Sequence, residues 1–210
     1  MILIPFVLGP GYIFNGILKA KYELPFLDGL SIDGFFSVDE LSSRIRNFRT
    51  PYTLYNYNRN TEEYNPVVIG GGPDQQGSLE EEHFSQSKTV GNIKLNFKRR
   101  FGSHNIDAFI GYERSENKDH TLGASRIHFP TTQTPELSQG GGAATDRDNY
   151  GSSYNFTRES FLSRIAYNYS EKYLAEFQMR VDGSSIFPEG NRYGVFPSIS
   201  AGYRITQEDW

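Results

Sequence analysis

Apolar and polar residues alternate with a period of two in most of this chain outside its glycine-rich and asparagine-rich stretches. Over 173–182, Tyr173, Phe177 and Val181 fall on one face, and the opposite face carries charged residues. A helix would mix these two sets, so the pattern predicts a β-strand. The same reading predicts about seven strands, over 18–24, 30–38, 88–98, 104–113, 161–169, 173–182 and 195–205.

Two positions are expected to interrupt the regular pairing of these strands. An apparent slip in the alternation near Gly34 predicts a β-bulge. Pro197 has no backbone N–H to donate to a neighbouring strand, so it predicts a bulge or a local loss of pairing.

The connections between the predicted strands alternate between short and long. Three are very short, at 25–29, 102–103 and 170–171, whereas the polar stretches 46–86, 117–157 and 184–192 predict longer loops. In an up-and-down meander, this places every short turn at one end and every long loop at the other. The asymmetry is typical of an outer-membrane barrel with periplasmic turns and extracellular loops.

The strand faces also favour a lipid environment. A charged side chain facing lipid costs about 2–4 kcal/mol at the bilayer midplane, and the face from Tyr173 to Val181 carries no charge. Aromatic residues beside the short turns predict a ring at the membrane interface: Tyr22, Phe26, Phe97, Phe101, Tyr167, Tyr169 and Tyr173. The alternative is a soluble antiparallel β-sandwich whose tyrosines pack in a core.

Composition excludes several classes of protein. The chain has 210 residues, no cysteine and a net charge of −4, which excludes disulfide scaffolds, cysteine-based metal sites and the basic surface typical of nucleic-acid binding. Its mean hydropathy is −0.56, and no apolar run is long enough for a transmembrane helix. The run 1–8 lacks the features of a signal peptide, so we expect the amino terminus to be cut or misannotated.

Two segments resemble a known family. The sequence SFLSRIAYNYSEKY at 160–173 and the sequence RVDGSSIFPEGNRYGVFPSISAGYRI at 180–205 resemble signatures of the SusC/RagA family of TonB-linked outer-membrane proteins. Tyr203 stands where tryptophan is commoner in the family. Weaker similarity extends through 111–113 and 22–26, so that the resemblance covers about residues 15–210.

The resemblance implies a transmembrane barrel of about 22 strands, filled by a plug domain. Such proteins import oligosaccharides or peptides with a SusD-type surface lipoprotein and energy from the TonB complex. We expect residues 1–210 to be a middle part of such a barrel in outer-membrane lipid, without the plug and the remaining strands, and not a working transporter alone. Seven strands would leave two unpaired edges, which lipid does not satisfy.

Few residues suggest chemistry. His104 is expected to be an interfacial ring on an apolar strand face, and His83, His120 and His128 are expected in loops, so no metal site is predicted on them. The segment 146–151 begins like a calcium loop, but Tyr150 and Thr157 stand at positions 5 and 12 of that loop, so two required oxygen ligands are absent. A polar surface loop is the favoured interpretation, and calcium is left open.

The remaining motifs indicate loops rather than catalysis. The glycine runs 70–72, followed by Pro73, and 140–142 match no phosphate-binding loop, and Glu80 to Glu82 predict a solvated charge run. No catalytic triad or carboxylate pair is apparent, so no enzyme activity, cofactor or catalytic residue is predicted.

Two functions follow from these observations. The first is nutrient uptake by a TonB-dependent receptor, with this chain supplying barrel wall and extracellular loops. The second is a soluble carbohydrate-binding or adhesive β-sandwich. Tyr52, Tyr55, Tyr57 and the stretch 131–154 suit either stacking on a sugar or contact with a lipoprotein, or they are loop tips without contacts.

Overall fold

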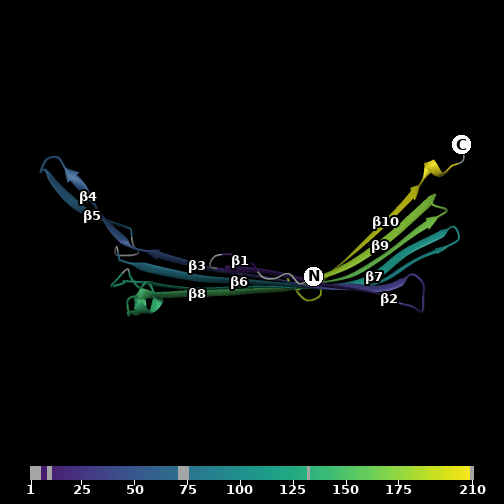
Figure 1. Ribbon diagram of the computed structural model, residues 1–210, viewed down its shortest axis with the longest axis horizontal. Coiled ribbons are helices and arrows are strands. Elements are labelled where there is room, and N and C mark those ends of the chain that lie inside the picture. Colours follow the sequence, from purple (N-terminus) through teal and green to yellow (C-terminus); the bar gives the residue numbers. More distant parts are fainter. Residues whose placement is uncertain (1–5, 9–10, 71–75, 132, 209–210) are drawn as a thin grey trace.

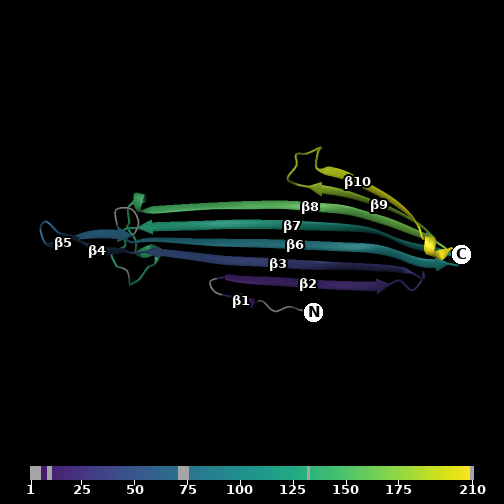
Figure 2. The ribbon, with the colours of Figure 1, turned by 90° about the horizontal axis from the view of Figure 1, so that it is seen from above.

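The computed structural model describes residues 6–8, 11–70, 76–131 and 133–208, and it consists of antiparallel β-strands with three short 3-10 helices. One eight-stranded sheet has the order β1-β2-β3-β6-β7-β8-β9-β10 (Figure 2), and β4 and β5 form a separate hairpin. The strands are β1 (Phe6–Leu8), β2 (Gly11–Glu23), β3 (Leu30–Arg49), β4 (Pro51–Asn58), β5 (Glu63–Gly70), β6 (Ser78–Phe101), β7 (His104–Ile127), β8 (Arg147–Tyr169), β9 (Tyr173–Ser184) and β10 (Tyr193–Tyr203). The 3-10 helices are η2 (Leu137–Gln139), η3 (Ala144–Asp146) and η4 (Ile205–Gln207).

The sheet is a single curved layer, seen edge-on in Figure 1. Its apolar face is uncovered: Ile110 is 60% exposed and Ile199 is 83% exposed. Among the described residues, the buried hydrophobic side chains are Leu79 and Phe129. A sandwich buries the inner faces of two packed sheets, so the predicted alternative of a soluble β-sandwich is wrong, and the predicted open antiparallel barrel wall is confirmed.

All seven predicted strands are present, but several are much longer than expected. β6 and β7 each contain 24 residues and β8 contains 23, whereas about 9–11 residues suffice to cross a bilayer. The predicted loop 46–86 is therefore wrong, because it contains the end of β3, the β4–β5 hairpin and the start of β6. The predicted loop 117–157 shrinks to the connection 128–146 between β7 and β8.

Neither of the two predicted irregularities occurs. Gly34 lies opposite Ala20 on β2 and Ile93 on β6 in an unbroken register, so there is no bulge. A Cβ at this position would meet the backbone oxygen of Asn92 at 2.5 Å, which explains a glycine there. Pairing also continues through Pro197, opposite Met179. β10 pairs with β9 alone among the described strands, and a strand with one partner tolerates proline.

The short turns lie together at one end of the sheet, as predicted (Figure 2). Gly29 and Gly102 adopt φ angles of 86° and 59°, which favour glycine. The turn after β8 places both Ser170 and Glu171 at positive φ, at 51° and 59°, the conformation that matches the twist of two-residue hairpins. The connection 128–146 and the β4–β5 hairpin lie at the opposite end.

None of the helices in the described part of the chain has the length and apolar character needed to cross a bilayer.

Candidate functional site

One face of the sheet carries a belt of apolar side chains across neighbouring strands. The pairing places Ile93, Tyr112, Phe161 and Val181 in one row. The row below it, which is the next row toward the short turns, contains Leu95, Ile110, Ser163 and Met179. We call this side of the sheet the outer face. From Tyr112 to His104 on β7 the belt spans about 26 Å along the strand, close to the roughly 25 Å apolar band of a transmembrane barrel.

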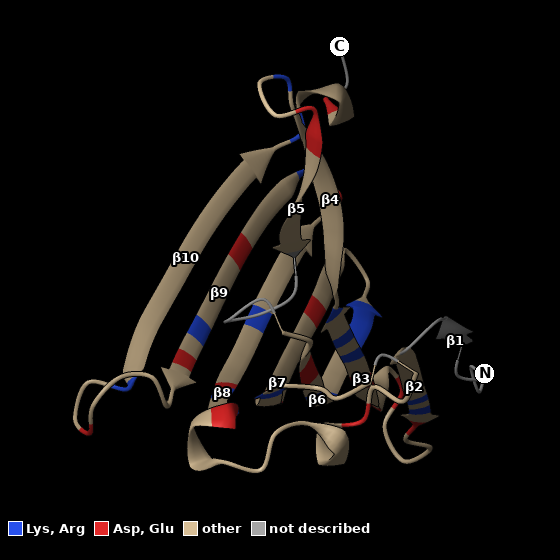
Figure 3. Cartoon of the chain, turned by 90° about the vertical axis from the view of Figure 1, so that its left-hand side faces the viewer, with Lys and Arg blue, Asp and Glu red and all other residues tan. Residues whose placement is uncertain are grey.

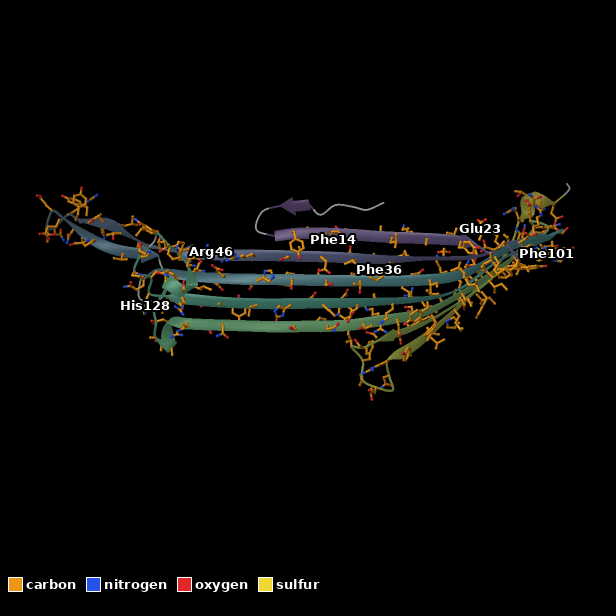
Figure 4. All side chains as sticks on the ribbon, turned by 60° about the horizontal axis from the view of Figure 1, so that its bottom comes forward. Phe14, Glu23, Phe36, Arg46, Phe101 and His128 are labelled. Carbon is orange, nitrogen blue, oxygen red and sulfur yellow. The ribbon has the colours of Figure 1, made fainter. Side chains whose placement is uncertain are left out.

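An aromatic row closes the belt beside the short turns. The ring centroids of His104 and Tyr169 are 5.0 Å apart, those of Tyr169 and Tyr173 are 6.3 Å apart, and those of Tyr173 and Tyr203 are 5.3 Å apart. Phe101 belongs to the same row and lies at the short-turn end in Figure 4. Of the predicted ring, Phe101, Tyr169 and Tyr173 lie in this row with His104, and His104 Nδ1 lies 2.6 Å from the hydroxyl of Tyr167. The register places Tyr22 level with Ile110 and Phe97 level with Ala108, so these two predicted members lie within the belt instead.

Charged residues end the belt on the other side. Arg114 and Glu159 face each other in the row directly above Tyr112 and Phe161. Glu159 accepts hydrogen bonds from Tyr112, at 2.9 Å, and from Tyr193. Between this row and the aromatic row, β7 to β10 present no Asp, Glu, Lys or Arg on the outer face, and β10 has no charged residue at all (Figure 3).

The opposite, inner face is polar, and it carries ion pairs at the same level along the strands as the apolar belt. Arg164 binds Glu176 at 2.6 Å and lies 3.7 Å from Asp107. Lys94 lies 3.4 Å from Asp33. An open hollow of about 580 Å³ lies around Asp107, Arg164 and Glu176. Asn168 also lines it, and its buried Oδ1 atom has no hydrogen-bond partner in the described part of the chain. The inner face therefore suits water or a polar partner.

Above the belt, β3, β6, β7 and β8 continue as a four-stranded panel, formed by residues 37–49, 78–90, 115–127 and 147–158, and β2 pairs with its β3 edge over 37–43. Figure 4 shows Arg46 and His128 at its far end and Phe36 nearer the belt. The predicted solvated run Glu80 to Glu82 lies here in β6, and it is not simply solvated. Glu81 binds Arg44 at 2.6 Å and Arg46 at 2.9 Å.

The connection 128–146 packs against the end of the panel. Phe129 is 7% exposed and makes an edge-to-face contact with Phe48, with centroids 5.3 Å apart. Arg46 donates to the carbonyl oxygen of Pro135 and lies 3.0 Å from Glu136. A Cβ at Gly140 would meet Phe129 at 3.1 Å. The glycine run 140–142 thus includes a packing position.

The remaining histidines do not form a metal site. His83 and His120 lie in β6 and β7 rather than in loops, so this part of the prediction is wrong. His120 Nδ1 lies 2.9 Å from Ser153 Oγ, and His128 Nδ1 lies 2.9 Å from Asp146 Oδ1. In the described ranges, His, Cys, Asp and Glu gather nowhere in groups of three or more that could hold a metal ion.

The calcium-like segment is not a loop. Asp146 ends η3, and Arg147 begins β8, so residues 147–157 are extended strand. The carboxylate of Asp146 accepts hydrogen bonds from the backbone N–H of Ala143, at 3.2 Å, and interacts with His128. The predicted polar loop over 146–157 is therefore wrong, because a straight strand cannot wrap its side chains around one cation.

The predicted loop aromatics occupy two different structures. Tyr52, Tyr55 and Tyr57 lie on β4 in a projecting hairpin, with exposed fractions of 47% to 66%. Tyr57 contacts Tyr64 of β5, with centroids 5.1 Å apart. Of the stretch 131–154, residues 147–154 belong to β8. Gly71, Gly72 and Pro73 of the first glycine run lie outside the described residues, as does most of the run 1–8.

Comparisons with known proteins agree with this geometry. No protein-family model matches the chain. The chain is 28% identical over 78% of its length to TonB-dependent receptor P3 of Formosa agariphila, and 29% identical over 57% of its length to TonB-dependent receptor SusC of Bacteroides thetaiotaomicron. It spans only 16% and 11% of the lengths of these relatives.

Solved structures share the fold. The RagAB peptide transporter superposes on 91% of this chain with a TM-score of 0.77 and 21% sequence identity, and the match covers 19% of that chain. The RagAB peptide importer in its 'closed-closed' state gives a TM-score of 0.78 over 95% of this chain. The sequence relatives, the shared sheet and the two-faced belt all make this chain similar to a segment of the antiparallel barrel wall of SusC/RagA-type TonB-dependent receptors.

Proposed function

We propose that this chain forms part of the wall and of the extracellular rim of a TonB-dependent nutrient importer. The observation that carries the proposal is the outer-face belt, which on β7 to β10 is free of charge between the aromatic row and the Arg114–Glu159 row. Such a belt suits lipid on one side, while the ion-paired inner face suits a polar lumen. The panel then stands above the membrane, where neither face meets lipid.

The proposed partners follow from the family. An importer of this kind works with a SusD-type surface lipoprotein and receives energy from the TonB complex through a plug region. Its substrate is an oligosaccharide or a peptide, and RagAB is named a peptide transporter. The relatives are named as receptors, which supports a role in binding and passage of a nutrient rather than in catalysis.

The orientation can be tested by labelling single cysteines, because these 210 residues contain none. Gly142→Cys lies in the connection 128–146, where an added Cβ has open space. Ser103→Cys lies in the short turn between β6 and β7. In intact cells making the protein in its natural outer membrane, a maleimide that cannot cross the membrane should label Gly142→Cys and spare Ser103→Cys.

Permeabilising the outer membrane is the control, and it should expose Ser103→Cys to the reagent. Labelling of Ser103→Cys in intact cells, with Gly142→Cys protected, would reverse the orientation and remove the proposed role of the panel as an extracellular rim. Equal labelling of both sites in intact cells would contradict a membrane position for the sheet.

A further inference from the structure

Strand β8 has neighbours on both sides only along its lower part. Residues from Arg158 to Tyr169 lie between β7 and β9, whereas 147–157 pair with β7 alone. The reason is β9 itself, which ends at Ser184 before the chain turns back toward β10. Figure 2 shows β8 continuing past the ends of β9 and β10. The panel therefore has a free strand edge that the neighbouring strand leaves open.

The direction of the free backbone groups follows from the contact between Thr157 and Ser185, the residue directly after β9. The N–H of Thr157 donates to Ser185 Oγ at 2.9 Å, and the N–H of Ser185 donates to the carbonyl oxygen of Thr157 at 2.9 Å. Because backbone groups in a strand alternate in direction, those of Gly151, Ser153 and Asn155 point to the same open side. They have no partner in the described part of the chain.

We propose that this edge, from Asn149 to Asn155, binds an extended oligopeptide as an added β-strand. The proposal rests on the proposed importer function and names a peptide as a substrate class. The edge spans about 20 Å, which fits a peptide of about five to seven residues. Exposed strand edges pair readily with another chain, and peptide recognition by strand addition uses backbone hydrogen bonds for affinity.

A peptide fits this edge better than a sugar does. The free groups alternate as donor and acceptor with the repeat of a polypeptide backbone, and sugar hydroxyls lack that repeat. The side chains in the middle of the edge, at Gly151, Ser152 and Ser153, are small and leave the backbone accessible. Ser153 is also held to the outer face by His120, at 2.9 Å, away from the path of a bound strand.

The flanks of the edge add modest selectivity. Tyr154 and Phe156 lie on the inner face with ring centroids 5.5 Å apart, so alternate apolar side chains of a bound peptide would pack beside them. The guanidinium of Arg158 lies 5.1 Å from the Phe156 ring and extends this surface. Asp148 lies at the end of this edge farthest from β9, and its carboxylate accepts a hydrogen bond from the N–H of Asn149 at 2.8 Å. Its carboxylate favours a cationic peptide terminus.

Binding should be measured on the full protein, purified in detergent, with a synthetic heptapeptide of lysine followed by alternating valine and threonine. The comparison ligand has the same sequence with methyl groups on three consecutive central amide nitrogens, which block both edges of the peptide. The unmodified peptide should bind, and the methylated peptide should bind about ten-fold more weakly or not at all.

Two variants at one position test the protein side. Ser153→Pro removes an N–H that points to the open edge and leaves the hydrogen bonds to β7, so it should weaken peptide binding about ten-fold. Ser153→Ala removes the hydroxyl but keeps the N–H, so it should bind the peptide like the unchanged protein. Equal binding by the two variants, or equal binding of the two peptides, would overturn the proposal.

Hydrogen exchange identifies the occupant. The amides of Gly151, Ser153 and Asn155 should exchange rapidly in the protein alone and slowly after peptide is added. Protection in the protein alone would assign the edge to another segment of the protein, and protection only when the lipoprotein is added would assign it to the lipoprotein. Either result would refute the peptide as the occupant. These measurements need neither TonB nor a membrane orientation, so a failed labelling result would leave them standing.

Discussion

At the residue scale, Tyr150 is held in an arrangement that joins three strands of the panel. It faces Gly123 of β7, and its hydroxyl donates to Glu82 of β6 at 2.6 Å. A Cβ at Gly123 would lie 2.2 Å from the tyrosine ring, so glycine makes room for the ring. Tyr193 makes an equivalent set of contacts on the outer face: its ring lies over Gly183 of β9, and its hydroxyl donates a hydrogen bond to Glu159 of β8.

The hydrogen bond to the Glu82 carboxylate raises the pKa of Tyr150 to about 12. Because the folded-state pKa lies above the usual value of 10, this contribution to stability is complete below pH 10 and is lost as the pH rises toward 12. Glu82→Gln should therefore lower the pKa of Tyr150 toward 10. The shift can be followed by NMR of labelled tyrosine rings, with Tyr150→Phe to assign the signal.

Glu80→Gln is the matched control for this experiment. Glu80 lies two residues away on the same strand and acts on Tyr150 only through its charge, with the smallest of the effects on this pKa. It should shift the Tyr150 pKa much less than Glu82→Gln does. A larger shift from Glu80→Gln would contradict the hydrogen bond as the main cause.

Contacts of this kind could not be predicted from the sequence. Glu82 and Tyr150 are separated by 68 residues, and no sequence motif around either residue indicates that they are in contact. Glu80 to Glu82 looked like one solvated run, yet strand geometry sends Glu81 to the outer face and Glu82 to the inner face. The partners of each depend on register across β3 to β8, which only the folded sheet defines.

At the scale of the strand, Ile165 and Ala166 of β8 test the two faces directly. Ile165 points to the outer-face belt, and Ala166 lies on the inner face between the register positions of Asp107 and Glu176. Ile165→Arg should destabilise the protein by about 2–4 kcal/mol, because it places a charge in the apolar band. Ala166→Arg should cost little, because two carboxylates stand beside it.

Unfolding by urea of the full protein in lipid vesicles measures this difference, with recovery in the outer membrane as a second readout. Similar losses from both substitutions, or a greater loss from Ala166→Arg, would mean that the face assigned to lipid is the wrong one. The two positions are adjacent in sequence, so backbone propensity affects them alike.

The strands were predictable in the belt and unpredictable in the panel. In the belt, one face is apolar and the other is polar, so 104–113 alternates clearly. Beyond Arg114, β7 continues through Glu116, Lys118 and His120 with polar residues on both faces. The period-two signal vanishes there because the residues on both faces are polar, although the backbone pairing continues to Ile127. The sequence of the panel therefore resembles that of a loop.

At the scale of the whole molecule, the β4–β5 hairpin is a separable part. Among the described strands, β4 and β5 pair only with each other, and Figure 1 shows the hairpin projecting beyond the end of the sheet. Replacing 51–70 by a short glycine-serine linker in the full protein should leave assembly into the outer membrane intact. The measurement is the heat-sensitive migration of the folded barrel in gel electrophoresis.

Removal of 98–107 provides the contrasting case, because it deletes the short turn and the lower end of the belt. This variant should fail to assemble. Failure of the hairpin replacement to assemble, under conditions where the unchanged protein does, would show that the hairpin supports the wall.

The division of each long strand into a belt and a panel has an evolutionary consequence. If the proposed membrane position holds, a substitution within the belt must satisfy lipid on one side and the lumen on the other. A substitution within the panel then meets water on both sides, and the ladder of backbone bonds tolerates most side chains. Sequence change can therefore accumulate in the panel without disturbing insertion. Relatives should diverge fastest along 78–90, 115–127 and 147–158, so that one membrane scaffold acquires new specificities by altering strands as well as loops.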